Sequence, residues 1–315
     1  MTPLRLLLSI VAAFFFIAAT AMAADAPTTV RIAYPQAGTN ISAQVGMVLE
    51  KTDILKKNGF APEMFAMSNG RDMKLALVSD KVDIIMTSEA NFVVLLAEGF
   101  ESYGIASLGE GGNMALTVKT NSGIERPDQL RGKTVGTIFG TSLHRPAIEW
   151  TEGVTGVKII SMPNIGALVA ALESNKIDAA MLWDPHLTDG VTKGSFRVLR
   201  QEPLELIAIS SKKFAERNPG ALERFQKGFK EAVFYFVTNK QQVNKWYSEV
   251  SKVDYKLIDK VSRINRNYDK KRLEKIDIRI SPTFIDKMKK TGAFLQAHKI
   301  TTKNPAIESA VRNPK

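Results

Sequence analysis

The sequence predicts an α/β protein of two lobes, joined by two crossover segments with a ligand cleft between them. Short apolar runs rich in β-branched residues alternate with segments of helical periodicity, and this series occurs twice, before and after about residue 120. An eleven-residue phrase also occurs twice, as ALVSDKVDIIM at 76–86 and ALESNKIDAAM at 171–181, with six identical positions. Because both copies span a helix end, a turn and a buried strand, two equivalent lobes explain the repeat.

The first series begins with a β-branched strand at 30–34, which ends at a proline. A helix follows, with apolar residues from Ile41 to Leu49 at helical spacing, and Asn58-Gly59 ends it. The remaining pattern predicts strands at 61–67, 82–87 and 103–108, with helices at 71–80 and 91–99 between them.

The second series follows an apolar segment at 115–120 and predicts strands at 132–139, 157–162, 177–182 and 195–200. Its helices are expected at 147–153 and 164–175, the latter with Asn164 as N-cap. From 211 onward the pattern is mostly helical, over 211–239, 241–250, 254–264 and 281–300. No Gly/Ser-rich linker is present, so ordered segments near 115–120 and 204–211 should join the lobes. The expected organisation is lobe 1 at 28–116, lobe 2 at 117–205, a return to lobe 1 at 206–300 and a tail at 301–315.

The first 23 residues are typical of a cleavable signal peptide. Arg5 precedes an apolar run from Leu6 to Thr20, and Ala21-Met22-Ala23 is a small-x-small cleavage site. The alternative is an uncleaved membrane anchor, for which the run is short. No cysteine follows, which excludes a lipoprotein anchor. We expect cleavage after Ala23 and export, most simply to a bacterial periplasm.

The chain is basic and contains no cysteine. Its formal charge is +11, and removal of the leader takes away one cation. Eight cations lie within residues 260–280, where acidic residues are interspersed and aromatics are scarce, which favours a solvated helical surface over a binding patch. The absence of cysteine excludes disulfides, thiolate metal sites and a cysteine nucleophile. Nucleic acid is not expected as a partner of an exported protein.

Candidate ligand-binding residues lie where strands lead into helices, because ligands of α/β sheets collect at the carboxyl ends of the strands. These loops are rich in hydroxyls, amides and glycine, which bind small polar or anionic groups beside helix N-termini. The candidates in them are Gln36, Thr39, Asn40, Asn69, Thr87, Ser88, Glu89, Gly140, Thr141, Ser142, Arg145, Asn164, Trp183, Asp184 and His186.

Two of these loops carry more specific expectations. Gly140-Thr141-Ser142 allows close backbone approach and offers two hydroxyls, although plain N-capping would also explain it. Pro146 is suited to the first helical position, which would leave Arg145 in the loop and free to point into the cleft. Trp183, after the second copy of the repeat, is expected to form an apolar wall, with core packing as the alternative.

No motif indicates an enzyme, a cofactor or a metal site. The three histidines, His144, His186 and His298, lack metal-ligand spacing, and no nucleophile elbow, Walker loop or dinucleotide fingerprint is present. The glycine-rich segment 109–113 lacks the Lys-Ser/Thr of a phosphate loop, so we expect a surface turn there. No catalytic residue, cofactor or metal is predicted.

The segment SGIERPDQLRGKTVGTIFGTSLH at 122–144 resembles a motif of the nitrate/sulfonate/taurine-type solute-binding proteins of ABC transporters, which are related to the NMT1/THI5-like proteins. The matching positions are Ser122, Gly123, Ile124, Gly132, Lys133, Val135, Gly136, Gly140 and Thr141, while Asp128 is displaced by one from the pattern. Both copies of the repeat and the helix near 214–232 also fit, so the resemblance spans roughly residues 30–299.

The resemblance implies a type II periplasmic binding protein, a monomeric receptor that closes on a small ligand and delivers it to a membrane permease. Oxyanions, small organic acids and sulfonates are the usual ligands of this family. Pro146, Glu89 and Asp184 depart from an obvious anion pocket, so a zwitterion or a nitrogen heterocycle remains open. The pyrimidine-synthase relatives need a cysteine-rich motif that this chain lacks. Two alternatives remain: a lyase-like enzyme on this fold with Glu89 or Asp184 as general base, and a receptor that presents its ligand to a membrane sensor.

Overall fold

Eight strands form one continuous sheet in the computed structural model, which describes residues 26–37 and 40–314. The order across the sheet is β2-β1-β3-β8-β4-β7-β5-β6. The strands are β1 (Thr28–Pro35), β2 (Phe60–Met67), β3 (Ile84–Ser88), β4 (Ser102–Lys119), β5 (Thr134–Thr137), β6 (Lys158–Ser161), β7 (Ala179–Trp183) and β8 (Phe196–Ser211).

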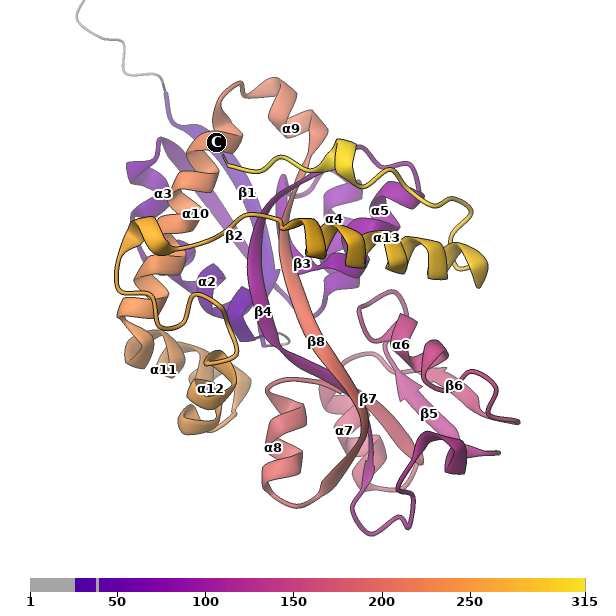
Figure 1. Ribbon diagram of the computed structural model, residues 1–315. Helices are drawn as coiled ribbons and strands as arrows, with labels where there is room; N and C mark the ends of the chain where they lie inside the picture. Colours follow the sequence, from indigo (N-terminus) through magenta and orange to yellow (C-terminus); the bar gives the residue numbers. More distant parts are fainter. Residues whose placement is uncertain (1–25, 38–39, 315) are drawn as a thin grey trace, which may run out of the picture.

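Strands β4 and β8 are the two crossover segments that join the lobes (Figure 1). They pair antiparallel from Ser102↔Ser211 to Lys119↔Phe196, far longer than any other strand pair. Near one end β8 pairs with β3, and near the other β4 pairs with β7. Strands β1 to β3 therefore belong to one lobe and β5 to β7 to the other, which confirms the predicted two-lobed α/β architecture.

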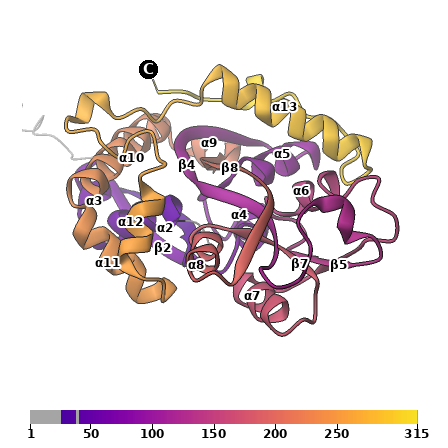
Figure 2. The ribbon, with the colours of Figure 1, turned by 60° about the horizontal axis from the view of Figure 1, so that its bottom comes forward.

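Helices cover both faces of the sheet, as the alternating pattern predicts (Figures 1 and 2). The C-terminal helices return to the first lobe, where α10 and α11 contact α2, while α13 contacts α5 of the first lobe and α6 of the second. The helices are α2 (Asn40–Lys51), α3 (Ile54–Lys57), α4 (Gly70–Val78), α5 (Glu89–Ala97), α6 (His144–Glu149), α7 (Ile165–Glu173), α8 (His186–Thr192), α9 (Lys212–Arg217), α10 (Ala221–Thr238), α11 (Lys240–Ser251), α12 (Tyr255–Ser262) and α13 (Pro282–Ala297), with 3-10 turns η2 (Pro127–Leu130), η3 (Leu273–Lys275) and η4 (Glu308–Ala310).

The core follows from the two-residue period of the strands. Ile32 and Ile84 face the layer that contains α2 and α10, whereas their neighbours Ala33 and Ile85 face the layer of α4, α5 and α13. Successive side chains of a strand point to opposite faces, so strands covered on both sides must be apolar throughout. This is why the strands of the sequence read as continuous apolar runs.

The repeated phrase performs the same structural task in both lobes. Asp83 of the first copy accepts a hydrogen bond from the backbone N–H of Arg31 at 2.8 Å, and its own N–H donates to the carbonyl of Arg31. Asp178 of the second copy makes the same reciprocal pair with Thr134, at 2.9 Å for the side-chain bond. Each aspartate thus fixes the start of β3 or β7 against the neighbouring parallel strand.

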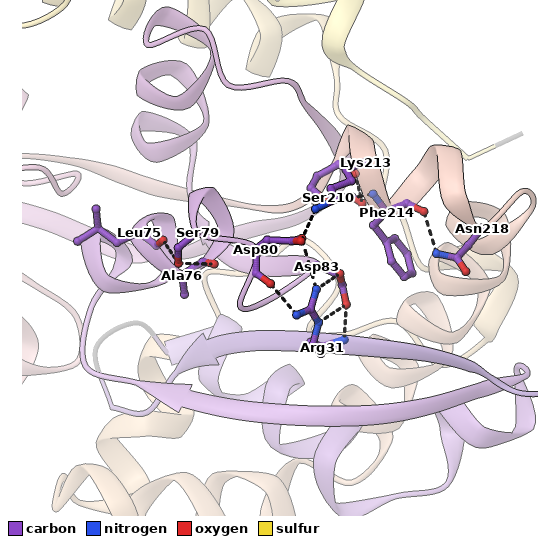
Figure 3. A network of polar contacts seen from close by, with 11 residues as sticks. Arg31, Leu75, Ala76, Ser79, Asp80, Asp83, Ser210, Lys213, Phe214 and Asn218 are labelled. Carbon is purple, nitrogen blue, oxygen red and sulfur yellow. Dashed lines mark hydrogen bonds and ion pairs between the residues drawn. The ribbon is translucent and has the colours of Figure 1, made fainter.

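The turn before each aspartate is also the same in both lobes. Asp80 and Asn175 occupy the left-handed region at φ 58°, and the preceding Ser79 and Ser174 donate to carbonyls of the last helical turn. In the first lobe the network extends further, because Arg31 also forms two hydrogen bonds to the Asp83 carboxylate and one to the Asp80 carbonyl (Figure 3). The repeated serine and aspartate are therefore structural.

The structure corrects three expectations. Residues 109–113 are no surface turn but a buried, bulged part of β4, where the register with β8 shifts between Glu110 and Asn113. The strand expected at 195–200 and the joining segment expected near 204–211 are parts of one continuous strand, β8, which begins at Phe196. In the basic stretch 260–280 the helix ends at Ser262 and the rest is turns, the 3-10 turn η3 and extended chain, because isoleucines at 276, 278 and 280 are buried at two-residue spacing.

Among the described residues, none of the helices is long and apolar enough to cross a membrane. The predicted signal peptide, residues 1–23, lies outside the described part of the chain.

Candidate functional site

A small cavity lies between the two lobes at the carboxyl ends of β1, β3, β5 and β7, the position that the strand-end rule predicts. Its volume is about 20 Å³, enough for about one water molecule. The first lobe contributes Pro35, Asn69, Gly70, Met73, Thr87, Ser88 and Asn91, and the second contributes Thr141, Ser142 and Trp183.

The wall from the first lobe is organised around Asn91. Its amide nitrogen donates to the hydroxyl oxygen of Thr87 at 2.8 Å and to that of Ser88 at 3.3 Å. Both hydroxyl oxygens therefore act as acceptors, which leaves their hydrogens to point elsewhere. The amide oxygen of Asn91 is buried and has no hydrogen-bond partner among the described residues. Asn69 is committed differently, because its side chain caps α4 by accepting from the N–H of Asp72.

The wall from the second lobe adds an indole and two hydroxyls. Trp183 is 4% exposed, and its Nε1 is buried without a hydrogen-bond partner among the described residues. Thr141 donates to the carbonyl of Ile138 at 2.7 Å, which closes the turn before α6. Ser142 is buried beside it. An unpaired N–H in a cavity wall costs free energy unless a ligand accepts from it, so Trp183 is a candidate ligand contact.

None of the ten lining residues carries a formal charge. The cavity instead lies at the N-terminal ends of α4 and α5, whose first residues follow the lining residues Asn69 and Ser88. The backbone N–H groups and the dipole at such ends favour a negatively charged ligand. The site can therefore bind an anion with neutral donors alone.

Glu89, the first residue of α5, lies next to this cavity wall but is not one of its lining residues. It is 1% exposed, and neither carboxyl oxygen has a hydrogen-bond partner among the described residues. Burial raises the pKa of Glu89, and the nearby cations Lys287 and Arg145 oppose this effect.

Asp184 is fully buried and uses its carboxylate for structure. One oxygen accepts from the N–H of Asn113 in β4 at 2.8 Å, and the other accepts from the N–H and hydroxyl of Thr188 in the first turn of α8. Burial raises the pKa of Asp184, and these hydrogen bonds partly offset that rise. Gly112 permits this contact at φ 107°, since a Cβ there would lie 2.5 Å from the Cβ of Asp184.

Arg145 belongs to α6 and is largely buried, whereas the sequence suggested a loop residue facing the cleft. Its guanidinium forms ion pairs with Glu149 of the same helix and with Glu202 of β8. Arg71, in the first turn of α4, directly follows the lining residue Gly70 but does not itself line the cavity. Its side chain lies against Gly140, where a Cβ would be 3.5 Å from Arg71 Cδ.

Three other candidates from the sequence, Gln36, Asn164 and His186, lie away from the cavity lining. Gln36 is exposed, and Asn164 caps α7 by accepting from the N–H of Ala167 at 2.9 Å. His186 begins α8 and bonds to the backbone of Ala37 in the first lobe, and burial lowers its pKa. Thr39 lies outside the described residues, and the side chain of Asn40 is likewise not described.

Sequence reasoning did not select four residues that line the cavity: Pro35, Gly70, Met73 and Asn91. Pro35, Gly70 and Asn91 lie in or beside loops that were recognised, and Asn91 lies four residues after Thr87, one helical turn away. Met73 faces the cavity because α4 begins at Gly70 and presents its first turn there. Within the described residues no group of three or more histidine, aspartate or glutamate side chains is placed to hold a metal ion.

Two lobes on two crossover strands, with a cavity at the facing strand ends, define a type II periplasmic binding fold, and the structural comparisons agree. The alkanesulfonate-binding protein SsuA of Xanthomonas axonopodis pv. citri, solved with MOPS, superposes with a TM-score of 0.77 over 92% of this chain and 100% of that one, at 16% identity. SsuA of Escherichia coli superposes with a TM-score of 0.72 over 90% of this chain and 97% of that one, at 17% identity. The nitrate-binding protein NrtA of Synechocystis PCC 6803 has a TM-score of 0.61 over 76% of this chain and 70% of that one, at 16% identity.

Residues 53–243 match the family described as NMT1/THI5 like, and the chain belongs to that family. A putative aliphatic sulfonates-binding protein of Bacillus subtilis (strain 168) is 24% identical in an alignment of 273 residues that covers 83% of this chain and 79% of that protein. These findings confirm the family and the fold that the motif at 122–144 indicated.

Proposed function

We propose that this protein is an extracytoplasmic solute receptor that binds a small organic sulfonate between its lobes and delivers it to an ABC importer. The observation that carries the proposal is the set of neutral donors in the cavity. The hydroxyls of Thr87, Ser88 and Ser142 and the indole N–H of Trp183 come from both lobes, beside two helix N-termini. A group with three acceptor oxygens and a permanent negative charge satisfies such donors without a cation.

A sulfonate fits this lining better than nitrate does. Pro35, Met73 and the ring of Trp183 add apolar surface to the wall, against which a short carbon chain can pack. Nitrate has no such chain. The named relatives also favour this ligand class, since the Bacillus subtilis protein and the two SsuA proteins carry aliphatic sulfonate or alkanesulfonate in their names.

Binding requires the lobes to move. A cavity of about 20 Å³ is too small for a sulfonate with its carbon chain, so the lobes part for entry and close around the ligand. The ligand then stabilises the closed form, because only that form lets donors from both lobes contact it at once. The permease recognises the closed, loaded receptor. In this scheme the lobes keep the expected boundaries, 28–116 with 206–300 and 117–205, and the receptor acts as a monomer.

The rival proposal of an enzyme is less well supported. Asp184 has its two oxygens engaged by three donors, so it is poorly placed to act as a general base. Glu89 lies outside the cavity lining. We therefore propose a receptor without catalytic activity, cleaved after Ala23 and located in the periplasm. A membrane sensor in place of the permease remains the alternative partner.

The test is calorimetric titration of the purified protein with ethanesulfonate, taurine, nitrate, acetate and thymine, together with thermal unfolding. Sulfonates should bind and raise the melting temperature by mass action, and acetate should do so weakly. Tight binding of thymine would show that the ligand is a heterocycle and not an anion. Tight binding of taurine alone would show that the ligand is a zwitterion. Conversion of a bound compound into a product would refute the receptor and favour the enzyme.

A further inference from the structure

Glu89 is a buried ionisable group to which the proposed ligand contacts assign no task. Its carboxyl is fully enclosed and unpartnered among the described residues, yet its neighbours Ser88 and Asn91 both line the cavity. A buried charge without hydrogen bonds is costly, so an isolated carboxyl in this position is expected to stay protonated.

The surrounding charges do not remove that cost. Lys287 on α13 and Arg145 on α6 attract Glu89, whereas Glu202 and Glu205 on β8 repel it. Both cations are already committed, since Arg145 pairs with Glu149 and Glu202, and Lys287 pairs with Glu205 at 3.1 Å. Two cations thus face three carboxylates before Glu89 is counted. On other elements that contact α5, Lys74 of α4 pairs with Glu98 at the far end of α5, Arg71 of α4 pairs with Asp72 at 3.7 Å, and Glu110 of β4 pairs with Arg266.

Charged residues of both lobes lie near Glu89. Glu89 belongs to the first lobe, whereas α6 with Arg145 belongs to the second, and α13 contacts both α5 and α6. In the proposed receptor, parting of the lobes moves Arg145 away from Glu89 and opens the cavity wall at Ser88 to water. A solvated glutamate returns to its ordinary acidity and is ionised at neutral pH.

We propose that Glu89 takes up a proton when the cleft closes on an anionic ligand, so that the anion and one proton bind together. This inference rests on the proposed receptor function and adds a determinant of charge selectivity to it. With Glu89 neutral, the N-terminal end of α5 keeps its attraction for an anion. With Glu89 ionised, a negative charge lies within the first helical turn and repels the ligand.

The direction of the pH dependence follows from linkage. Burial raises the pKa of Glu89 in the closed form. Protonation of Glu89 therefore favours closure, and this stabilisation of the closed form is complete below the ordinary glutamate pKa. That contribution is lost as the pH rises through the raised value. Between the two values, ligand affinity falls by up to tenfold for each pH unit.

The experiment is titration calorimetry with ethanesulfonate from pH 5 to pH 8, in buffers of different ionisation enthalpy, which reports the protons taken up on binding. Ethanesulfonate stays ionised throughout and contributes no protons. Glu89→Gln is compared with wild type, and Glu98→Gln, at the other end of α5, is the matched control. The difference between variant and wild type isolates Glu89 from the histidines that also titrate in this range. Infrared difference spectra of wild type provide a second measurement that needs no variant.

Between the ordinary and the raised pKa of Glu89, wild type and Glu98→Gln should take up as much as one proton more per bound ligand than Glu89→Gln. Glu89→Gln should bind ethanesulfonate more tightly than wild type at pH 8, with a flatter pH profile. Ligand addition to wild type should increase the C=O band of a protonated carboxyl. Equal proton uptake in wild type and Glu89→Gln, or no change in that band, overturns this inference alone. Failure of wild type to bind ethanesulfonate at any pH removes the proposed function, and this inference with it.

Discussion

Replacement of Trp183 by phenylalanine removes one hydrogen-bond donor from the cavity wall and leaves an aromatic ring in place. Trp183 ends β7, opposite Met114 of β4, and is 4% exposed, with Nε1 buried and unpartnered among the described residues. If Nε1 donates to an ionised sulfonate oxygen, its loss costs about 1.5–3 kcal/mol of binding free energy, because hydrogen bonds to charged groups lie in that range. The dissociation constant for ethanesulfonate should then rise by about 10- to 150-fold.

The stability of the ligand-free protein should change little, or increase, in Trp183→Phe. The substitution removes an unsatisfied donor, and the smaller ring leaves only a modest space. Thermal unfolding without ligand and calorimetric titration with ethanesulfonate separate the two effects. Trp150→Phe is the matched control, because Trp150 lies in the same lobe, is also 4% exposed, and contacts the Arg200 guanidinium at 5.8 Å instead of the cavity.

Trp150→Phe should bind ethanesulfonate with wild-type affinity. Wild-type affinity in Trp183→Phe would refute the assignment of Nε1 as a ligand donor. A large loss of melting temperature in Trp183→Phe, with affinity unchanged, would assign Trp183 to the core instead.

Three further substitutions test the frame that positions the site. Asp184→Ala should lower the unfolding free energy by about 3 kcal/mol or more in urea titration, because three partly buried donors lose their acceptor. A loss below about 1 kcal/mol would contradict this. Gly112→Ala should lower the unfolding free energy by about 1–3 kcal/mol more than Gly123→Ala, because both glycines have positive φ but only Gly112 lies against a buried side chain. Equal losses in the two variants would contradict the contact between Gly112 and Asp184. Asp83→Asn should lower the unfolding free energy by about 1 kcal/mol more than Asp178→Asn, since Asp83 also accepts two hydrogen bonds from the guanidinium of Arg31. The reverse order of melting temperatures would show that these two hydrogen bonds add no stability.

The strands and the repeat were predictable because their determinants are local. β-branched runs and a two-residue period define strands that are covered on both faces, whatever the rest of the chain does. The repeated aspartate was recognisable for the same reason, since a helix end, a left-handed turn and a strand start need the same few residues in both lobes. Its hydrogen bond to the neighbouring strand, however, spans 52 residues in one lobe and 44 in the other and could not be read from the local pattern.

The glycine-rich segment 109–113 shows how a local rule fails. Glycines usually indicate turns because they tolerate positive φ. Gly109 and Gly112 do have positive φ, but within a bulged strand at the centre of the crossover. There the missing Cβ provides room for side chains from distant elements, as Asp184 against Gly112 and Leu206 against Gly111 demonstrate. The requirement for small residues comes from packing partners about 70 to 95 residues away, which no local pattern contains.

The same reasoning explains which part of the candidate site was predictable. The strand-end rule identified the loops, and six of the fifteen candidates line the cavity. Among residues of one loop, however, the direction of a side chain depends on its distant partners. Arg145 was expected to face the cleft because Pro146 was expected to begin the helix, yet Glu202, 57 residues later in β8, holds its guanidinium. This pairing removes the obvious cation from the site and leaves neutral donors. In the proposed receptor, discrimination among anions then rests on hydrogen-bond geometry, and affinity for an anion depends on whether Glu89 carries its proton.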